Sequence, residues 1–296
     1  MKRHDPARRR FLAGAMATGV AGSAAASVQL QTETGAPELD GRKVPEPSSE
    51  RSAGPVRAGR GSDLSGKVAV VTGAARGIGR AIAVEFAANG ADVVALDIAG
   101  FVSPASNARP ATMAELNEIV RQVQQFGRRG EAVQADIQDI EALRSVARRA
   151  FAPGMVRQKK GRLILLSSMQ GKHGTKDASS YSASKWGILG LMKSAAMELG
   201  QHNITVNAII PGLVDTPLTR YERRLAESIG ETGRNPGPDP SPEEAWDIRA
   251  ATVPMKVGWL QPDDISPVAV FLASDAANLV TGAEYEVTAG DSAKDI

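Results

Sequence analysis

Residues 67–97 constrain the fold most strongly, because two short apolar runs flank a glycine-rich turn and a helical pattern. The runs KVAVVTG and ADVVALD are short and rich in β-branched residues, as expected of strands buried on both faces. Between them, Ile78, Ile82 and Phe86 recur at helical spacing. Gly90 follows where such a helix would end. The pattern predicts a β-strand, an α-helix and a second, parallel β-strand.

The same alternation continues toward the C-terminus. Thr112 and Glu115 have the spacing of a capping box, which predicts a helix to about Phe126. Further strands are predicted at EAVQADI, GRLILLSS, NITVNAIIPG and EYEVTAG, and further helices over 139–151, 181–200 and 265–275. Strands that alternate with helices form a parallel sheet with helices on both faces. We therefore expect an α/β fold with a doubly wound, Rossmann-like parallel sheet, in a single domain over residues 63–296.

The region before this domain has a different composition. Residues 1–26 begin with basic residues, continue with a weakly apolar run and end in small residues, which is the layout of an export signal. The stretch Arg8-Arg9-Arg10-Phe11-Leu12 resembles the twin-arginine pattern. The run is too short and too poor in large apolar residues for a stable membrane span. Residues 27–62 are rich in Pro, Gly, Ser and charge and indicate a flexible linker. We expect an exported, periplasmic protein, and the alternative is a cytoplasmic protein with a disordered basic tail.

Composition excludes several classes of function. The net charge of +2 suggests no nucleic-acid partner. The absence of cysteine rules out disulfides, thiolate catalysis and cysteine-ligated metals. The three histidines do not pair with carboxylates at metal-ligand spacing, so no metal is expected.

The turn TGAARGIG has the chemistry of a dinucleotide-binding loop. Gly73, Gly77 and Gly79 follow a predicted strand and open a predicted helix. Residues without a Cβ let the backbone approach a pyrophosphate, and the helix N-terminus supplies free N–H groups. Turns also use glycines, but the strand–turn–helix context favours a bound dinucleotide.

Two carboxylates follow the next two predicted strands. Asp97 can accept hydrogen bonds from the ribose hydroxyls of an adenosine and would repel a 2′-phosphate, which favours NAD over NADP. Arg76, inside the glycine turn, is the opposing indication, because a basic group there can tolerate a phosphate. Asp136 is a candidate contact to the adenine edge, or else an exposed turn residue. The predicted cofactor contacts also include Ile78 and Ile137.

A second group of residues can carry proton chemistry. Tyr181 and Lys185 are four residues apart at the start of a predicted helix, so their side chains share one face. Ser168 ends the preceding strand. A neighbouring ammonium would lower the pKa of the phenol, whose ordinary value of about 10 is too high for easy proton exchange at neutral pH. Tyr181 could then act as general acid or base on an alcohol or carbonyl, with a hydrogen bond from Ser168 to the same oxygen.

These motifs together resemble the classical short-chain dehydrogenase/reductase family. The resemblance rests on TGAARGIG, Asp97, LLSS, YSASK and IIPGLVDTP, and it extends from about Leu64 to Gly290. A looser likeness, from the loop at 98–110 and GWLQPDDIS, is to the mycofactocin-associated, carveol-dehydrogenase-like subgroup. The resemblance implies an NAD-dependent enzyme that transfers hydride between the nicotinamide and a secondary alcohol or ketone, with Ser168, Tyr181 and Lys185 as the catalytic residues. Lys185 would also hold the nicotinamide ribose. By position, further nicotinamide and phosphate contacts would come from Pro211, Gly212, Val214 and Thr216.

One interval is too short for this family pattern. The family places a strand with an Asn-Asn-Ala-Gly-type motif and a helix with a catalytic Asn before the serine-bearing strand. Here only residues 138–161 intervene, and they contain no Asn. A complete strand–helix–strand repeat takes about 30 residues. We therefore expect that one strand and one helix are missing. The alternative function is a catalytically impaired nucleotide-binding protein.

Residues 213–258 follow the last predicted site segment. They are polar and interrupted by Pro and Gly, which predicts either a mobile substrate lid or a disordered insertion. The expected partner is a small alcohol or carbonyl compound. A homo-oligomer is possible, although the helix that forms the family's dimer face lies in the missing interval.

Overall fold

A computed structural model describes residues 63–102, 109–136, 139, 154–176, 178–220, 222–235, 237 and 240–294. The predicted export signal at 1–26 and linker at 27–62 lie outside the described residues, as does the helix predicted over 139–151 apart from its first residue. Within the described part of the chain, no helix has the length and apolar character needed to cross a membrane. The same residues hold no cluster of side chains suited to a metal ion.

The predicted strands and helices that fall within the described residues are confirmed, with ends that shift by a few residues. The strands are β1 (Val68–Thr72), β2 (Asp92–Asp97), β3 (Gly130–Gln134), β4 (Gly161–Leu166), β5 (Ile204–Pro211) and β6 (Glu284–Val287). The helices are α2 (Gly77–Ala88), α3 (Met113–Gln125), α5 (Gly154–Gln158), α6 (Ser179–Leu199), α7 (Glu222–Gly230), α8 (Pro242–Thr252) and α9 (Pro262–Ala273). The predicted capping box of α3 is present, and Gly90 ends α2 with a φ of 96°.

The strands form two parallel sheets of three strands each. Their orders are β1-β2-β3 and β4-β5-β6. Among the described residues, no strand pairs with the second edge of β1 or with the second edge of β4. The strand predicted to be missing would precede β4 in the chain, so these unpaired edges agree with the short interval at 138–161.

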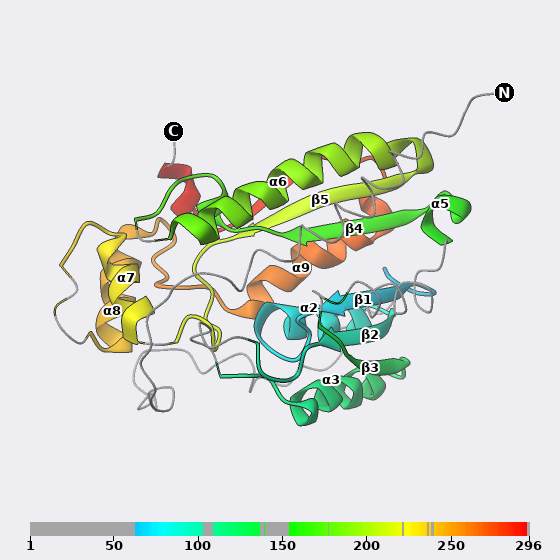
Figure 1. Cartoon of the computed structure of the whole chain (residues 1–296), viewed down its shortest axis with the longest axis horizontal. Coiled ribbons are helices and arrows are strands. Elements are labelled where there is room, and N and C mark those ends of the chain that lie inside the picture. Colours follow the sequence, from blue (N-terminus) through cyan, green and yellow to red (C-terminus); the bar gives the residue numbers. More distant parts are fainter. Residues whose placement is uncertain are drawn as a thin grey trace.

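Helices cover both faces of the second sheet, and the alternation of side chains along β5 explains why. Val206, Ala208 and Ile210 pack against α6, whereas Ile209 points the other way, into the core that holds α9. Figure 1 shows α6 and α9 on opposite sides of β4 and β5. An eight-residue strand buried at every position requires both layers.

The two sheets are joined through α9 and α2. These helices pack together, and one apolar core contains Ile82 of α2, Ile265 of α9 and Val71 of β1. Near the amino ends of β1 and β4, the Asp275 carboxylate accepts a hydrogen bond from Lys67 at 2.7 Å. The same carboxylate lies 3.3 Å from the ammonium of Lys160. The two sheets are therefore held together, and the carboxyl ends of their strands lie along one shared edge.

The described residues of the segment predicted as a mobile lid or a disordered insertion include two helices, α7 and α8. Disorder of the whole segment is therefore wrong, and the lid stays a prediction. Leu225 and Ile229 of α7 are buried against Trp259. Ser241 caps α8, and Pro242 occupies its first turn. Figure 1 shows α7 and α8 packed together at one end of the molecule. A polar sequence can fold here because a small separate apolar cluster is enough to hold two short helices.

Candidate active site

The glycine turn connects β1 to α2 through a close approach of two backbone segments. A Cβ on Gly79 would lie 2.1 Å from the carbonyl oxygen of Gly73, so only glycine fits there. Gly77 has a φ of 53°, a region that favours glycine. Among the described residues, no side chain caps the N-terminus of α2. The first amides of the helix are therefore left for another acceptor, which fits the pyrophosphate of a dinucleotide.

The segment after β5 lies against this turn. A Cβ on Gly77 would be 3.1 Å from Cγ2 of Thr216, so two parts of the chain far apart in sequence meet at one crevice. Pro211 ends β5, and the N–H of Gly212 bonds to β6. The Val214 side chain is buried in the core, which leaves only its backbone for a ligand. The structure thus brings most of the residues predicted from IIPGLVDTP to the edge that holds the glycine turn.

Asp97 ends β2 beside the glycine turn, as predicted. One carboxylate oxygen accepts from the N–H of Ala75 at 3.1 Å, and the other accepts from the N–H of Ala99 at 3.0 Å. The residue is 8% exposed. A carboxylate offers about four acceptor positions, so Asp97 keeps capacity for ribose hydroxyls.

Arg76 is engaged elsewhere than the sequence suggests. Its guanidinium bonds both oxygens of Glu115, at 3.0 Å and 2.9 Å. The charge that could favour a phosphate is thus paired with the first turn of α3.

Asp136 and Ile137 follow β3. Asp136 lies two residues beyond Gln134, whose strand position is paired with Asp97, so its backbone is next to the predicted adenosine site. Ile137 lies outside the described residues. Both remain predictions as cofactor contacts.

Ser168, Tyr181 and Lys185 come together at the carboxyl end of β4. The side chains of Ser168 and Tyr181 are hydrogen-bonded. The ammonium of Lys185 lies 5.4 Å from the centre of the Tyr181 ring and donates to the carbonyl of Leu166 at 3.1 Å. Ser167 fixes the helix by donating from its hydroxyl to the Lys185 carbonyl at 2.9 Å. The predicted cluster exists, on rigid elements.

The expected lowering of the Tyr181 pKa is wrong for this structure. Burial raises the pKa of the phenol, and the hydrogen bond with Ser168 and the charge of Arg224 only partly oppose that rise. Lys185 does not offset the rise, because its ammonium is directed to a backbone carbonyl. Burial instead lowers the pKa of Lys185 to about 8. The lysine, rather than the tyrosine, is the group that titrates near neutral pH.

This shift predicts a pH-dependent stability that Lys185→Met removes. In an unfolded chain the ammonium titrates near pH 10.4, whereas in the folded chain its pKa is about 8. Between these values the unfolded chain binds more protons, so the free energy of unfolding rises with pH. We expect the free energy of unfolding of wild type, relative to that of Lys185→Met, to rise by about 2 kcal/mol from pH 7.5 to pH 9.5. Denaturant titrations at both pH values measure it, and a difference that stays constant would refute the shift.

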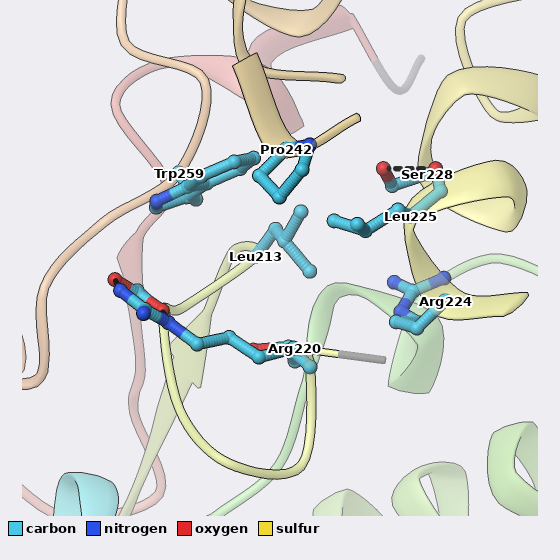
Figure 2. Close-up of a pocket in the computed structure, with 9 residues that line it drawn as sticks. Leu213, Arg220, Arg224, Leu225, Ser228, Pro242 and Trp259 are labelled. Atoms are coloured by element: carbon cyan, nitrogen blue, oxygen red, sulfur yellow. Dashed lines mark hydrogen bonds and ion pairs between the residues drawn. The ribbon is translucent and has the colours of Figure 1, made fainter. Parts of the chain in front are cut away.

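A pocket lies between α7, the start of α8 and the segment after β5, and its lining residue Arg224 also acts on the Tyr181 phenol. In Figure 2, Leu213, Leu225, Pro242 and Trp259 gather on one side of it, with two arginines along the other. Its full lining is Leu213, Asp215, Thr219, Arg220, Arg224, Leu225, Ser228, Pro242 and Trp259. None of the three predicted catalytic residues lines it. The pocket therefore lies on the side of α7 and α8 and does not contain the groups predicted to react.

Sequence reasoning missed Glu115 as a site residue and missed two charges near Tyr181. Arg224 and Glu231 both act on the Tyr181 phenol, and they bond each other at 2.8 Å. Glu231 also accepts from Gln170, two residues after Ser168, at 3.4 Å. Residues 213–258 contain many charged side chains, and nothing in the sequence distinguishes Arg224 and Glu231 from the others.

A parallel α/β sheet with a glycine turn, an acidic residue after the second strand and a Ser, Tyr and Lys cluster defines a class of dinucleotide-binding oxidoreductases. Comparison with known families agrees. The family described as short chain dehydrogenase matches residues 67–152, and that described as enoyl-(acyl carrier protein) reductase matches residues 131–292. The chain belongs to the short-chain dehydrogenase/reductase family.

Three relatives illustrate the likeness. A short-chain type dehydrogenase/reductase of Mycolicibacterium smegmatis is 32% identical over 280 aligned positions, which cover 78% of this chain and 99% of the relative. The (−)-trans-carveol dehydrogenase of Rhodococcus erythropolis is 29% identical, with 78% and 99% covered. The crystal structure of carveol dehydrogenase from Mycobacterium avium in complex with NAD is 28% identical, with a TM-score of 0.70 and coverage of 78% and 99%.

These alignments also bear on the short interval. The first extends over 280 positions, yet 78% of a 296-residue chain is fewer residues than that. The relative therefore has residues inside the aligned region that this chain lacks, which agrees with the predicted loss of one strand and one helix.

Proposed function

We propose that this protein is an NAD(H)-dependent oxidoreductase that transfers hydride between the nicotinamide and the carbon of a secondary alcohol or ketone. One observation carries the proposal. Ser168, Tyr181 and Lys185 meet at the carboxyl end of β4, on the edge where the glycine turn and the segment after β5 also meet. Ligands of open parallel sheets bind at that edge.

The residues present fit NAD. The uncapped N-terminus of α2 and the close-packed glycines can hold a pyrophosphate, and Asp97 can accept from ribose hydroxyls. A related carveol dehydrogenase is described in complex with NAD. Bound NAD would supply the hydride acceptor for alcohol oxidation and, reduced, the donor for the reverse reaction.

The protein's own residues would move the proton. Tyr181 takes the hydroxyl proton of an alcohol or returns it to a carbonyl oxygen. Ser168, which is hydrogen-bonded to the phenol, can donate to a substrate oxygen beside it. Lys185, with a pKa of about 8, exchanges protons readily near neutral pH. The apolar side of the pocket at α7 supports a substrate whose body is largely hydrocarbon.

The test is turnover by the purified full chain. NAD and a panel of secondary alcohols, cyclic and acyclic, should produce reduced nicotinamide, followed by its absorbance. Omission of the alcohol is the control for background reduction. Absence of turnover with every alcohol, and with the matching ketones and NADH, would contradict the proposal.

A second candidate function is nucleotide binding without catalysis. It is favoured by the two separate sheets and by the short interval at 138–161, where the family's catalytic Asn has no counterpart. Calorimetry with NAD, combined with the turnover assay, distinguishes the two candidates. NAD binding with no turnover supports the second, and NAD binding with turnover supports the first.

A further inference from the structure

Arg76 lies next to the predicted ribose site, but its charge is committed to another residue. Its neighbour Ala75 donates a backbone hydrogen bond to Asp97, so the two residues share one part of the crevice. Its guanidinium donates from Nε and Nη2 to the two oxygens of Glu115. Its side chain is 15% exposed. A bidentate pair of this kind is strong and specific in geometry.

Two backbone carbonyls hold the same guanidinium. Nη1 of Arg76 donates to the carbonyl oxygen of Arg109 at 2.6 Å, and Nη2 donates to that of Pro110. An arginine side chain has five N–H donors. These contacts, with the two to Glu115, engage four of them, so little capacity is left for a phosphate.

Glu115 is itself held by three residues. Its carboxylate accepts from the backbone N–H and the hydroxyl of Thr112, at 2.8 Å and 2.9 Å, in the capping box of α3. It also accepts from Arg109 at 2.8 Å. Burial would raise the pKa of Glu115, but the hydrogen bonds from Arg76, Thr112 and Arg109 lower it to about 2. The carboxylate is thus charged at any pH at which the protein is studied.

We propose that Glu115 is a positioning residue that sets cofactor choice by withholding Arg76 from a 2′-phosphate. With Arg76 neutralised, the acidic Asp97 dominates the ribose site, and NAD is preferred over NADP. This inference rests on the proposed NAD-dependent function. It assigns selectivity to a residue on α3, which contributes no predicted contact to the cofactor.

The test measures the ratio of the dissociation constants of NADP and NAD by calorimetry on the full chain. Glu115→Gln removes the charge but keeps the side chain's size and an acceptor for Thr112. The released Arg76 should lower the ratio about tenfold, the scale of one charge-assisted hydrogen bond. The double variant Arg76→Ala/Glu115→Gln should lose this gain. A purely structural role of Glu115 would change both affinities together and leave the ratio unaltered.

Glu118→Gln is the matched control. Glu118 lies on the same helix but pairs with Arg121, so its removal tests the effect of one lost negative charge alone. Its ratio should stay within about twofold of the wild-type ratio, since no guanidinium near the ribose site is released. An equal gain in Glu118→Gln would overturn the proposal.

The remaining outcomes separate the two claims. Wild type that binds NAD, with an unchanged ratio in Glu115→Gln, overturns the role of Glu115 and leaves the proposed function intact. Wild type that binds neither nucleotide overturns the proposed function and this inference with it. If Glu115→Gln does not fold, Arg76→Ala alone decides. A severalfold rise in its ratio would show that Arg76 already serves NADP, whereas an unchanged ratio supports the proposal.

Discussion

Tyr181→Phe should lower the turnover of alcohol by about 100-fold to 10,000-fold, the range that general acid–base catalysis contributes. The substitution removes one oxygen and keeps the ring that packs near Lys185. Only the proton transfer is lost, because no other described side chain donates to or accepts from the same oxygen except Ser168. Steady-state kinetics with NAD and the best alcohol of the panel measure the loss, and calorimetry should show NAD affinity within about twofold of wild type.

Tyr285→Phe is the matched control for this prediction. Tyr285 lies on β6 and packs edge-to-face against Phe271 of α9, in the core that also holds α2. The same loss of a phenolic oxygen should leave turnover unchanged. Turnover by Tyr181→Phe within a few-fold of wild type would mean that another group handles the proton, and the assignment of Tyr181 would be withdrawn.

Gly79→Ala should abolish NAD binding and destabilise the fold by at least about 3 kcal/mol, at the upper end of overpacking effects. The added Cβ would lie 2.1 Å from the carbonyl oxygen of Gly73. The Cβ is bonded directly to the backbone and the oxygen is part of it, so no flexible side chain can move aside. The turn between β1 and α2 would have to open, which displaces the amides that fit a pyrophosphate. Denaturant titration and calorimetry with NAD measure the two effects.

Gly190→Ala is the control for this substitution. Gly190 lies within α6, where an added Cβ meets nothing within 4 Å. Alanine favours a helix over glycine by about 1 kcal/mol, so this variant should be as stable as wild type or slightly more stable. A Gly79→Ala protein that unfolds at the wild-type denaturant concentration and binds NAD would show that the turn is not close-packed.

Much of the fold was predictable because buried parallel strands have a distinctive composition. The run at β5 is mostly apolar, and the structure buries every one of its residues, Thr205 and Asn207 included. The capping box at Thr112 and Glu115 also predicted the start of α3 correctly. Such signals are local, since they depend on residues within one turn or one strand.

The helices α7 and α8 were not predicted, although local signals for them exist. Ser241 and Pro242, followed by two acidic residues, have the pattern of a helix start. Leu225 and Ile229 are four residues apart, as on one helix face. The polar surroundings concealed both signals. What stabilises these helices is their contact with Trp259 and the buried Arg249, which bonds to the carbonyls of Ser228 and Gly258.

The sequence by itself determined which chemical groups the protein has and which local elements carry them: a glycine turn, an acid after β2, and a phenol and an amine one helical turn apart. Only the tertiary structure decided how those groups behave. Glu115 takes up the charge of Arg76 across 39 positions of sequence, and burial raises the pKa of Tyr181 where a local pairing predicted the reverse. The physical reason is common to both. Ion pairing and desolvation depend on what surrounds a group in space, and its neighbours in sequence supply only part of those surroundings.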